Sequence, residues 1–495
     1  MTRPHPVGPP CGRVHRRTFL SDMGMGFTGL ALGSMLSGDR AARAESIAEP
    51  SGLTHFKPRA KSVIWIFLSG GYSHLETFDP KPMVNKYAGK TFKQTPFQNP
   101  LDSPLHKQRS RSVLAGMDRD TTAEILPLQV GFKKRGESGI EVADWLPHLA
   151  SCVDDMSIVR SMYTTDNDHA AEAQIHTGRH KLDDTQPSVG SWLHYGLGSL
   201  NENLPSFIVL GDFTSPNISQ NFQSEYLGPK HAGIRLSLDP KNPLPFASRG
   251  EDVLAQEQQN EYDFIHQLDS LSTVEYPQDD QLRARIRSYE LAFRMQMAVP
   301  EALDLQSETL ETHRLYGMDN PKTRAQGERL LAARRLAERG VRYSLVYLSD
   351  YGEWDAHQKL KEGHAACCEK IDKPTAGLLK DLKRRGLMDD VLVVFCTEFG
   401  RTPALQTQFS DGRKDGRDHH PHGFSVWFAG AGVKRGHVHG ATDELGYHAI
   451  ENGHYVTDIH ATVLHLMGLG SSRLDVPGRK RLEIDYGNVI SDIIA

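Results

Sequence analysis

The sequence predicts an α/β fold in which a mostly parallel sheet is covered by helices on both faces. From residue 62 onward, short apolar runs alternate with amphipathic stretches. The runs are apolar along their whole length, which is typical of strands buried on both faces, and the stretches between them repeat at helical spacing. A chain of 495 residues is also long enough to bury a large core.

Six apolar runs are the expected strands, and four amphipathic stretches are the expected helices. The first run, Ser62 to Leu68, ends in Ser69-Gly70-Gly71, which favours a buried strand followed by a loop whose backbone passes close to another segment. The other strands are expected at 156–159, 207–210, 343–348, 391–396 and 424–428, and the helices at 170–176, 187–200, 323–339 and 366–385. The last helix stops at Gly386, a residue typical of helix C-termini.

Two regions interrupt this alternation. Residues 83–135 are polar and rich in Pro, Lys and Gln, which predicts a surface insertion. Residues 250–320 are charged and carry helical patterns at 251–271 and 281–297, which predicts a helical insertion acting as a lid or a dimerisation arm. We therefore expect one domain over residues 45–495 with two insertions.

Composition excludes several classes of protein. The chain has 57 Lys and Arg against 62 Asp and Glu, a balance that argues against a strongly basic nucleic-acid binder. Outside the N-terminus no apolar run is long enough for a stable transmembrane span. Five cysteines, one of them within the first 44 residues, do not make a disulfide scaffold, so we expect the other four to be small buried side chains.

The first 44 residues have the pattern of an export signal. Arg16 and Arg17 precede a mildly apolar stretch at 23–36, and the small-residue sequence at 42–44 resembles a cleavage site. Paired arginines favour the twin-arginine route, which predicts the twin-arginine translocase as a partner and a periplasmic or secreted location. A short amphipathic anchor is the alternative interpretation.

Carboxylates and imidazoles follow the predicted strands. In open α/β sheets, ligands bind beyond the carboxyl ends of the strands. Asp355 and His357 follow the strand at 343–348, Glu398 follows the strand at 391–396, and His419 and His420 precede the strand at 424–428. These side chains are typical ligands of first-row divalent metals, so we predict a metal site, with the choice between His419 and His420 left open.

A further candidate is His169. The sequence Asp168-His169-Ala170-Ala171 opens a predicted helix that runs into Thr177-Gly178-Arg179. A helix N-terminus favours an anion or an activated nucleophile, although an ordinary Asp cap would explain the same residues.

Taken together, these segments resemble the alkaline-phosphatase/sulfatase superfamily and, more closely, an exported bacterial family of unknown function (DUF1501). The resemblance covers nearly the whole chain after the leader and rests on the order and spacing of its motifs. They are FLSGGYSHLETFDPK at 67–81, WDAH at 354–357, CTEFGRTP at 396–403, GRDHH at 416–420, AGAGVKRG at 429–436 and TDIHATVLHLMG at 457–468.

The resemblance implies a three-layer αβα sandwich with one or two metal sites. Asp355, His357 and one histidine of the 419–420 pair would form the first site. Glu398 stands where relatives carry an acidic ligand of a second site, but Phe399 replaces the histidine that usually follows. Ser69 and Gly70 replace another acidic ligand, for which His74, Glu76 and Asp79 are possible substitutes.

The nucleophile departs from the family pattern. No cysteine lies in the Cys-x-Pro-x-Arg sequence of sulfatases, which disfavours a formylglycine sulfatase. The equivalent position holds Asp168 and His169, and Thr164 and Thr165 lie slightly early. His169 would be a metal ligand, a phosphate acceptor or the group that positions a water.

The function implied is an exported metal-dependent hydrolase of phosphate- or sulfate-type esters. Zinc is the favoured metal, with manganese and calcium as alternatives, and a small molecule or a polysaccharide would carry the ester. Arg401 or Arg179 would bind the anionic oxygens. Two alternatives stay open: a non-catalytic surface-binding protein that retains the fold, and a metal-dependent phosphomutase.

Overall fold

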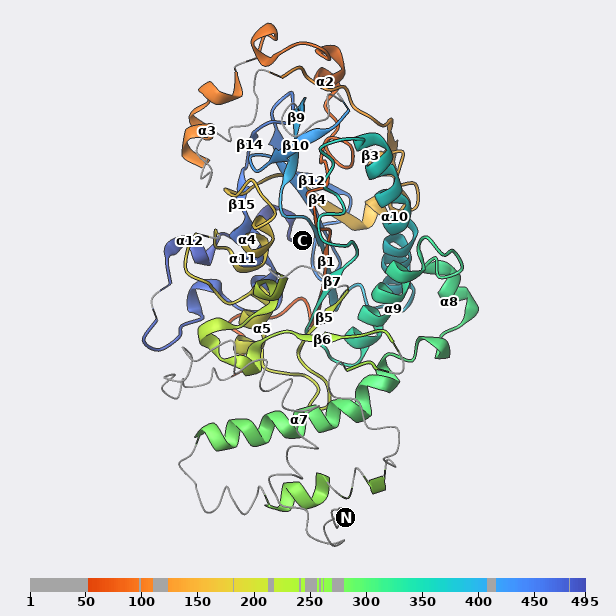
Figure 1. Cartoon of the computed structure of the whole chain (residues 1–495), viewed down its shortest axis with the longest axis vertical. Coiled ribbons are helices and arrows are strands. Elements are labelled where there is room, and N and C mark those ends of the chain that lie inside the picture. The colour runs from red at the N-terminus through yellow and green to blue at the C-terminus, as the bar shows by residue number, and fades with distance from the viewer. Residues whose placement is uncertain are drawn as a thin grey trace, which may run out of the picture.

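A nine-stranded sheet runs through the centre of the molecule and is seen nearly edge-on in Figure 1. The computed structural model describes residues 52–495 except 98, 110–122, 181, 212–217, 240–241, 245–255, 258–259, 261, 269–279, 407–414 and 480. The predicted export signal lies outside the described residues. Within them, no helix combines the length and the apolar character needed to cross a bilayer.

The sheet is mostly parallel, as predicted. Its central strand, β1 (Ser62–Phe67), lies between β7 (Tyr343–Tyr347) and β8 (Val391–Cys396) and is parallel to both. The full order is β12-β4-β11-β8-β1-β7-β5-β6, with β15 also paired to β4. The other strands are β4 (Met156–Tyr163), β5 (Phe207–Leu210), β6 (Ile234–Leu236), β11 (Phe424–Ala429), β12 (His437–His439) and β15 (His454–Tyr455). Of these, β11 is antiparallel to both of its neighbours.

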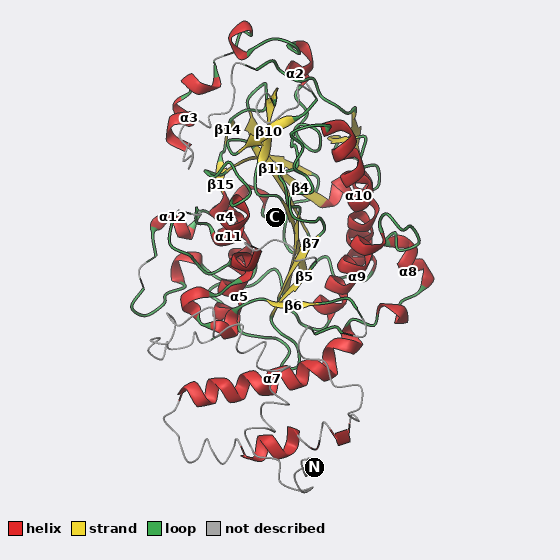
Figure 2. Cartoon of the chain, in the orientation of Figure 1, coloured by secondary structure: helices red, strands yellow, loops and turns green. Residues whose placement is uncertain are grey.

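Helices cover both faces of the sheet, which makes a three-layer α/β/α arrangement (Figure 2). Successive side chains of β1 alternate between two cores. Ile64 and Ile66 join the core under α9 (Arg324–Glu338) and α10 (Leu360–Arg384). Trp65 joins the core under α5 (Val189–Leu197) and α11 (Val456–Leu466).

The predicted elements are all present, and most of their bounds agree closely with the observed ones. The fourth helix begins at Leu360, well before the predicted start at 366, and β4 continues to Tyr163, beyond the predicted end at 159. The strands β6, β12 and β15 were not predicted, and neither was the strand pair that follows Glu398, β9 (Gly400–Leu405) with β10 (Arg417–His420). Both strands are buried, although β10 is entirely polar, so apolar periodicity could not find it. Cys152, Cys367, Cys368 and Cys396 are buried and free, as predicted.

The two predicted insertions project at opposite ends of the molecule (Figure 1). The polar region contains α2 (Pro82–Lys86), η1 (Phe92–Gln94), η2 (Pro100–Asp102) and α3 (Pro104–Arg109), and it ends within β2 (Phe132–Arg135). The other region contains α7 (Asp280–Ala302), η7 (Leu305–Ser307) and α8 (Leu310–Leu315). Short elements complete the fold: β3 (Ile140–Ala143), η3 (Leu149–Asp155), α4 (Ala171–Thr177), β13 (Ala441–Thr442), β14 (Ala449–Glu451) and α12 (Glu483–Tyr486).

Candidate metal centre

Loops at the carboxyl ends of β1, β7 and β8 meet at one edge of the sheet. The loop after β1 passes so close to the loop after β7 that a Cβ added to Gly70 would lie 2.6 Å from the backbone nitrogens of Trp354 and Asp355. Gly70 also has a φ of +113°, which other residues rarely adopt. Its N–H donates to Glu398 Oε1 at 2.8 Å, which connects this loop to the loop after β8.

Asp355 is the centre of the site. Its Oδ1 lies 3.0 Å from His357 Nε2 and 3.1 Å from His419 Nε2, and its Oδ2 lies 3.1 Å from His169 Nε2. The three imidazoles come from the loop after β7, from β10 and from the segment before α4. One carboxylate therefore gathers three potential metal ligands from distant parts of the chain.

Two overlapping groups have ligand atoms close enough to share a cation. His169, Asp355 and His419 form the first group, and His357, Asp418 and His419 form the second. Within each group the ligand atoms lie within 4.8 Å of one another. Imidazoles with carboxylates are a donor set that suits Zn²⁺ and other first-row divalent ions, so the residues present fit the predicted metal.

His169 connects this group to Glu398. Its Nδ1 lies 3.1 Å from Glu398 Oε1, on the ring side opposite Asp355. Burial opposes protonation of His169, but the hydrogen bonds to Asp355 and Glu398 outweigh it and raise its pKa to about 9. Without a cation, therefore, a proton on His169 holds the two carboxylates together.

The surroundings of Asp355 and His419 keep the carboxylate ionised and the imidazole neutral. Burial raises the pKa of Asp355, but hydrogen bonds from the three histidines and the charge of Arg401 lower it well below its usual range. Burial lowers the pKa of His419 to about 3, so this imidazole is neutral, the form that binds metals.

Arg401 is fully buried and holds the loops in place. Its Nε donates to the Gly71 carbonyl at 2.8 Å, its Nη1 to the Arg417 carbonyl at 3.2 Å, and its Nη2 to Asp355 Oδ1 at 2.7 Å and to the Gly70 carbonyl. Each of its three nitrogens is thus bonded within the protein. This differs from the expected anion-binding role, because no N–H is directed at solvent.

Phe399 fills the space where the resemblance implied a histidine. Its ring is fully buried, with its centroid 4.5 Å from that of His419 and 5.7 Å from that of His169. The aromatic side chain packs against two candidate ligands and supplies none itself.

A further acidic side chain, Glu172 on α4, lies next to this centre, between Ser69 and Asn221. It accepts a hydrogen bond from the Ser69 hydroxyl, and its other oxygen lies 3.3 Å from Asn221 Nδ2. Burial, followed by the charge of Glu398, raises the pKa of Glu172 to about 8. Ser69, which stands in place of an acidic ligand, thus contacts a carboxyl group that comes from another element.

Several predicted residues lie outside this group. His420 contacts the Tyr447 carbonyl through Nε2, because neighbouring residues of β10 point in opposite directions, so His419 is the member of the pair that reaches Asp355. Arg179 pairs with Asp485, with Nε 2.6 Å from Oδ1. The proposed substitutes are engaged as well: His74 contacts the Gly446 carbonyl, Glu76 pairs with Arg417, and Asp79 pairs with Lys81.

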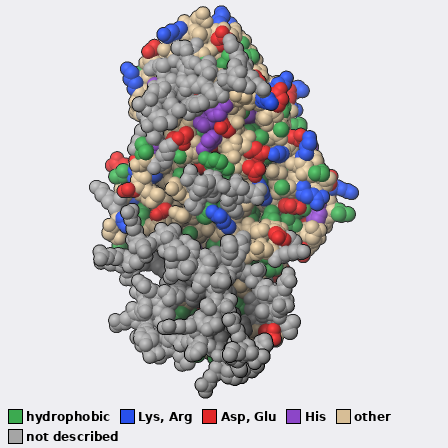
Figure 3. All heavy atoms as spheres, viewed as in Figure 1, with side chains coloured by type: hydrophobic (Ala, Val, Ile, Leu, Met, Phe, Trp, Pro, Cys, Tyr) green, Lys and Arg blue, Asp and Glu red, His purple; other side chains and the backbone are tan. Residues whose placement is uncertain are grey.

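The centre is open on one side. The side chains of Asp355 and His357 are each 24% exposed and that of His169 is 19% exposed, whereas Glu398 is fully buried. Histidine and acidic side chains gather on the face shown in Figure 3. A substrate approaching from solvent would therefore meet Asp355, His357 and His169 first.

A family model described as a protein of unknown function (DUF1501) matches residues 60–494. The chain belongs to this family. None of the curated proteins matches the sequence of the DUF1501 protein.

Among solved structures, the DUF1501 protein is similar to three ester hydrolases. The phosphonate monoester hydrolase SpPMH from Silicibacter pomeroyi has a TM-score of 0.36 at 13% identity, with 70% of this chain and 71% of that chain covered. The PsFucS1 sulfatase from Pseudoalteromonas sp. has a TM-score of 0.34 at 11% identity, covering 95% and 76%. A mutant TAB5 alkaline phosphatase with Mg bound in its M3 site has a TM-score of 0.30 at 11% identity, covering 83% and 99%.

Sequence reasoning missed two acidic residues of the site. Asp418 precedes His419 in the motif at 416–420, but only the two histidines of that motif were predicted as ligands. The structure places Asp418 Oδ1 3.6 Å from His357 Nδ1. Glu172 follows His169 by three residues across the turn that opens α4, and both lie near Glu398; this spacing was the available signal.

Proposed function

We propose that this DUF1501 protein is a metal-dependent hydrolase of phosphate- or sulfate-type esters. The observation that carries the proposal is the contact of Asp355 with three imidazoles from separate segments, on an edge of the sheet that is open to solvent. A metal centre requires that imidazole and carboxylate ligands from separate segments converge in this way.

Asp355, His357 and His419 would hold the cation, with Asp418 as a further ligand and His169 beside them. Once bound, a divalent cation supplies Lewis acidity, which polarises an ester and lowers the pKa of a coordinated water toward ~7. Zinc is our first choice because imidazole nitrogen dominates the donor set, and manganese or calcium would favour the carboxylates.

Glu398 would orient His169 for proton transfer. A hydrogen bond from Nδ1 to Glu398 leaves Nε2 toward the open side, beside Asp355. An imidazole held in this way can accept a proton from a water and return it to a leaving group. His169 thereby occupies the position of the missing hydroxyl or cysteine, but in our proposal it moves the proton of a water and does not itself attack the ester.

Water is the proposed nucleophile because the neighbouring hydroxyls are engaged. Thr164 donates its hydroxyl to Gln174 Oε1, and Thr165 accepts from Gln174 Nε2 at 2.8 Å. The hydroxyls of both threonines are thus bonded to Gln174 on α4.

A non-catalytic binding protein is the second candidate. Two observations favour it: Phe399 occupies a ligand position, and the guanidinium of Arg401 is fully buried and bonded to the surrounding loops. Such a protein would retain the fold and bind a cation or a surface without turnover.

The proposal is tested on the purified chain lacking its first 44 residues. Metal content and hydrolysis of aryl phosphate and aryl sulfate esters are measured after addition of Zn²⁺, Mn²⁺ or Ca²⁺, for the wild type and for His357→Ala. We expect a bound metal and ester hydrolysis in the wild type, and at least a tenfold loss of metal affinity in the variant.

His465→Ala is the matched control, because this half-buried histidine belongs to neither ligand group. The control should behave as the wild type in both assays. Bound metal without hydrolysis of either ester would favour the non-catalytic candidate, and equal metal content in the wild type and His357→Ala would contradict the proposed centre.

A further inference from the structure

A second cluster of histidines lies apart from Asp355. His106 on α3, His422 between β10 and β11, and His448 just before β14 have ligand nitrogens within 4.8 Å of one another. All three side chains are buried, with 6%, 4% and 3% of their surface exposed. None of them belongs to the centre described above.

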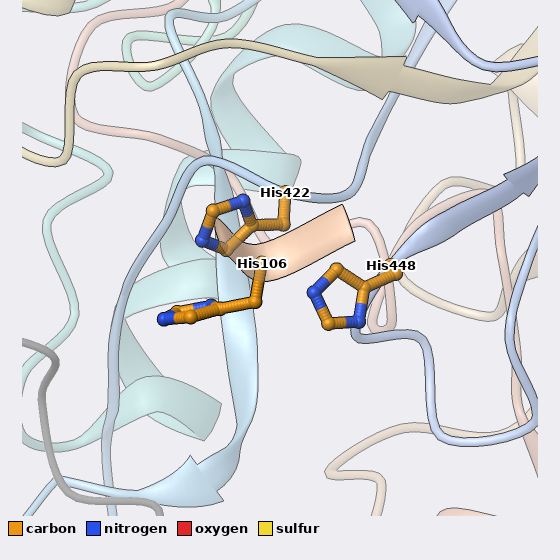
Figure 4. A group of neighbouring side chains, drawn as sticks. All are labelled: His106, His422 and His448. Carbon is orange, nitrogen blue, oxygen red and sulfur yellow. The ribbon is translucent and has the colours of Figure 1, made fainter. Parts of the chain in front are cut away.

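The three rings face one another across a small space (Figure 4). The ring centroids of His106 and His422 are 4.9 Å apart, those of His422 and His448 are 5.3 Å apart, and those of His106 and His448 are 6.2 Å apart. Nitrogens bound to one Zn²⁺ lie at most about 4.2 Å apart. Small rotations of the side chains would therefore bring the three nitrogens to coordination distance.

His448 supplies the sharpest evidence. Its Nε2 is buried and has no hydrogen-bond partner among the described residues. Its Nδ1 lies 3.8 Å from Asp443 Oδ2, and Asp443 in turn accepts from the backbone N–H groups of Tyr447 and His448. A carboxylate behind one ring nitrogen, with the other nitrogen facing the cluster, is the usual arrangement of a metal-binding histidine.

The neighbours of the cluster include a further imidazole and a guanidinium. His420 lies beside His422, with ring centroids 5.4 Å apart, but its Nε2 is bound to the Tyr447 carbonyl. Arg109 is the nearby cation; its guanidinium donates to the Ala449 carbonyl at 2.9 Å and stacks on Tyr163 at 3.8 Å from the ring centroid. Close packing of buried neutral imidazoles costs free energy unless something satisfies their nitrogens.

We propose that His106, His422 and His448 form a separate structural site for a divalent cation of the zinc type. This ion would connect the polar insertion, through α3, to the turn between β10 and β11. Because β10 carries Asp418 and His419, the same ion would fix the strand that supplies two residues of the candidate catalytic centre. Three imidazoles leave a fourth position for a water or an anion.

The test measures metal content and Zn²⁺ binding of the full exported chain for the wild type, His448→Gln and Asp355→Asn. The proteins are stripped with a chelator and titrated with Zn²⁺ alone, and with Co²⁺ as a coloured substitute. We expect His448→Gln to lose about one equivalent or at least tenfold in affinity for it, while Asp355→Asn retains that equivalent. Because each variant removes a ligand of only one site, an error in the proposed histidine site can be told apart from an error in the proposed hydrolase centre.

His231→Gln is the matched control, since His231 is a buried histidine outside all the ligand groups. It should bind as much metal as the wild type. Equal binding by His448→Gln and the wild type would overturn the proposal, and so would an equal loss in the His231→Gln control.

Limited proteolysis of the wild type gives a second readout that needs no variant. Removal of the metal should increase cleavage around α3, and Zn²⁺ should restore protection. If His448→Gln does not fold, His106→Gln takes its place in the titration, and unchanged cleavage of the wild type after chelation would contradict the site.

Discussion

Asp355 accepts contacts from three imidazoles and one guanidinium on its two oxygens. His357, His419 and Arg401 approach Oδ1, and His169 approaches Oδ2. A carboxylate in this position is a natural metal ligand, because it neutralises the cation and its neighbours already point at the same space. The hydrolysis that we propose depends on the surroundings of this one side chain.

The pKa of His169 gives a prediction for the metal-free protein. Its folded-state pKa of about 9 lies above the unfolded value of 6.5, so its stabilising contribution is fully present below pH 6.5 and is lost as the pH rises through about 9. The contribution is at most about 3 kcal/mol. In urea unfolding between pH 6 and 10, the difference in free energy of unfolding between the wild type and His169→Gln should therefore shrink toward alkaline pH. A difference that stays constant would show that no proton is shared with Asp355 and Glu398.

At the scale of elements, the loop after β1 is the most constrained part of the site. Gly71 has a φ of +72°, and a Cβ there would lie 2.3 Å from the ring of Phe399. The Gly71 carbonyl also accepts a hydrogen bond from Nε of Arg401. This loop, the Phe399 ring and the Arg401 guanidinium therefore hold one another in place.

Gly71→Ala should lower the free energy of unfolding by about 1–3 kcal/mol and weaken metal binding, because the added methyl group displaces Phe399 or the loop. Gly139→Ala is the matched control, with a φ of +69° and open space around the added Cβ. Thermal unfolding and metal titration of both variants make the comparison. Equal effects of the two substitutions would mean that only the backbone conformation matters.

Apolar patterning predicted the apolar buried strands well, but it did not predict the polar buried strand β10. Strands such as β1 and β8 are buried on both faces, and their sequence shows it directly. In contrast, β10 consists of Arg417, Asp418, His419 and His420, all buried, and it is stabilised by pairing with β9 and by charge interactions that no local pattern reveals. The same limitation hid the contribution of Asp418, while strand-end position and residue type were enough to predict Asp355, His357 and one histidine of the 419–420 pair as neighbours; only the structure selects His419.

At the scale of the whole molecule, the order of the strands brings the site together. β1 lies between β7 and β8, so the loops that follow these strands meet although they are separated by some 280 and 330 residues in the chain. Parallel pairing could be predicted from composition, but the strand order and the antiparallel direction of β11 could not, because they depend on long-range packing. The side chains of Asp355, His357 and His169 remain partly exposed where these loops meet.

The predicted export signal determines where the whole chain is located. The paired arginines predict that Arg16→Lys combined with Arg17→Lys leaves the uncleaved chain in the cytoplasm, because the twin-arginine pathway reads both side chains. Cell fractionation with detection of the chain measures this directly. Unchanged export of the double variant would exclude the twin-arginine route.

The central claim is that a divalent cation binds among Asp355, His357, His419 and His169. Anomalous diffraction from crystals of the exported chain grown with Zn²⁺ or Mn²⁺, recorded at the absorption edge of the metal, tests it most directly. The account predicts a strong peak within coordination distance of Asp355 and at least two of these imidazoles. It would be contradicted if that position showed no peak at saturating metal while Asp355 kept its hydrogen bonds to all three histidines.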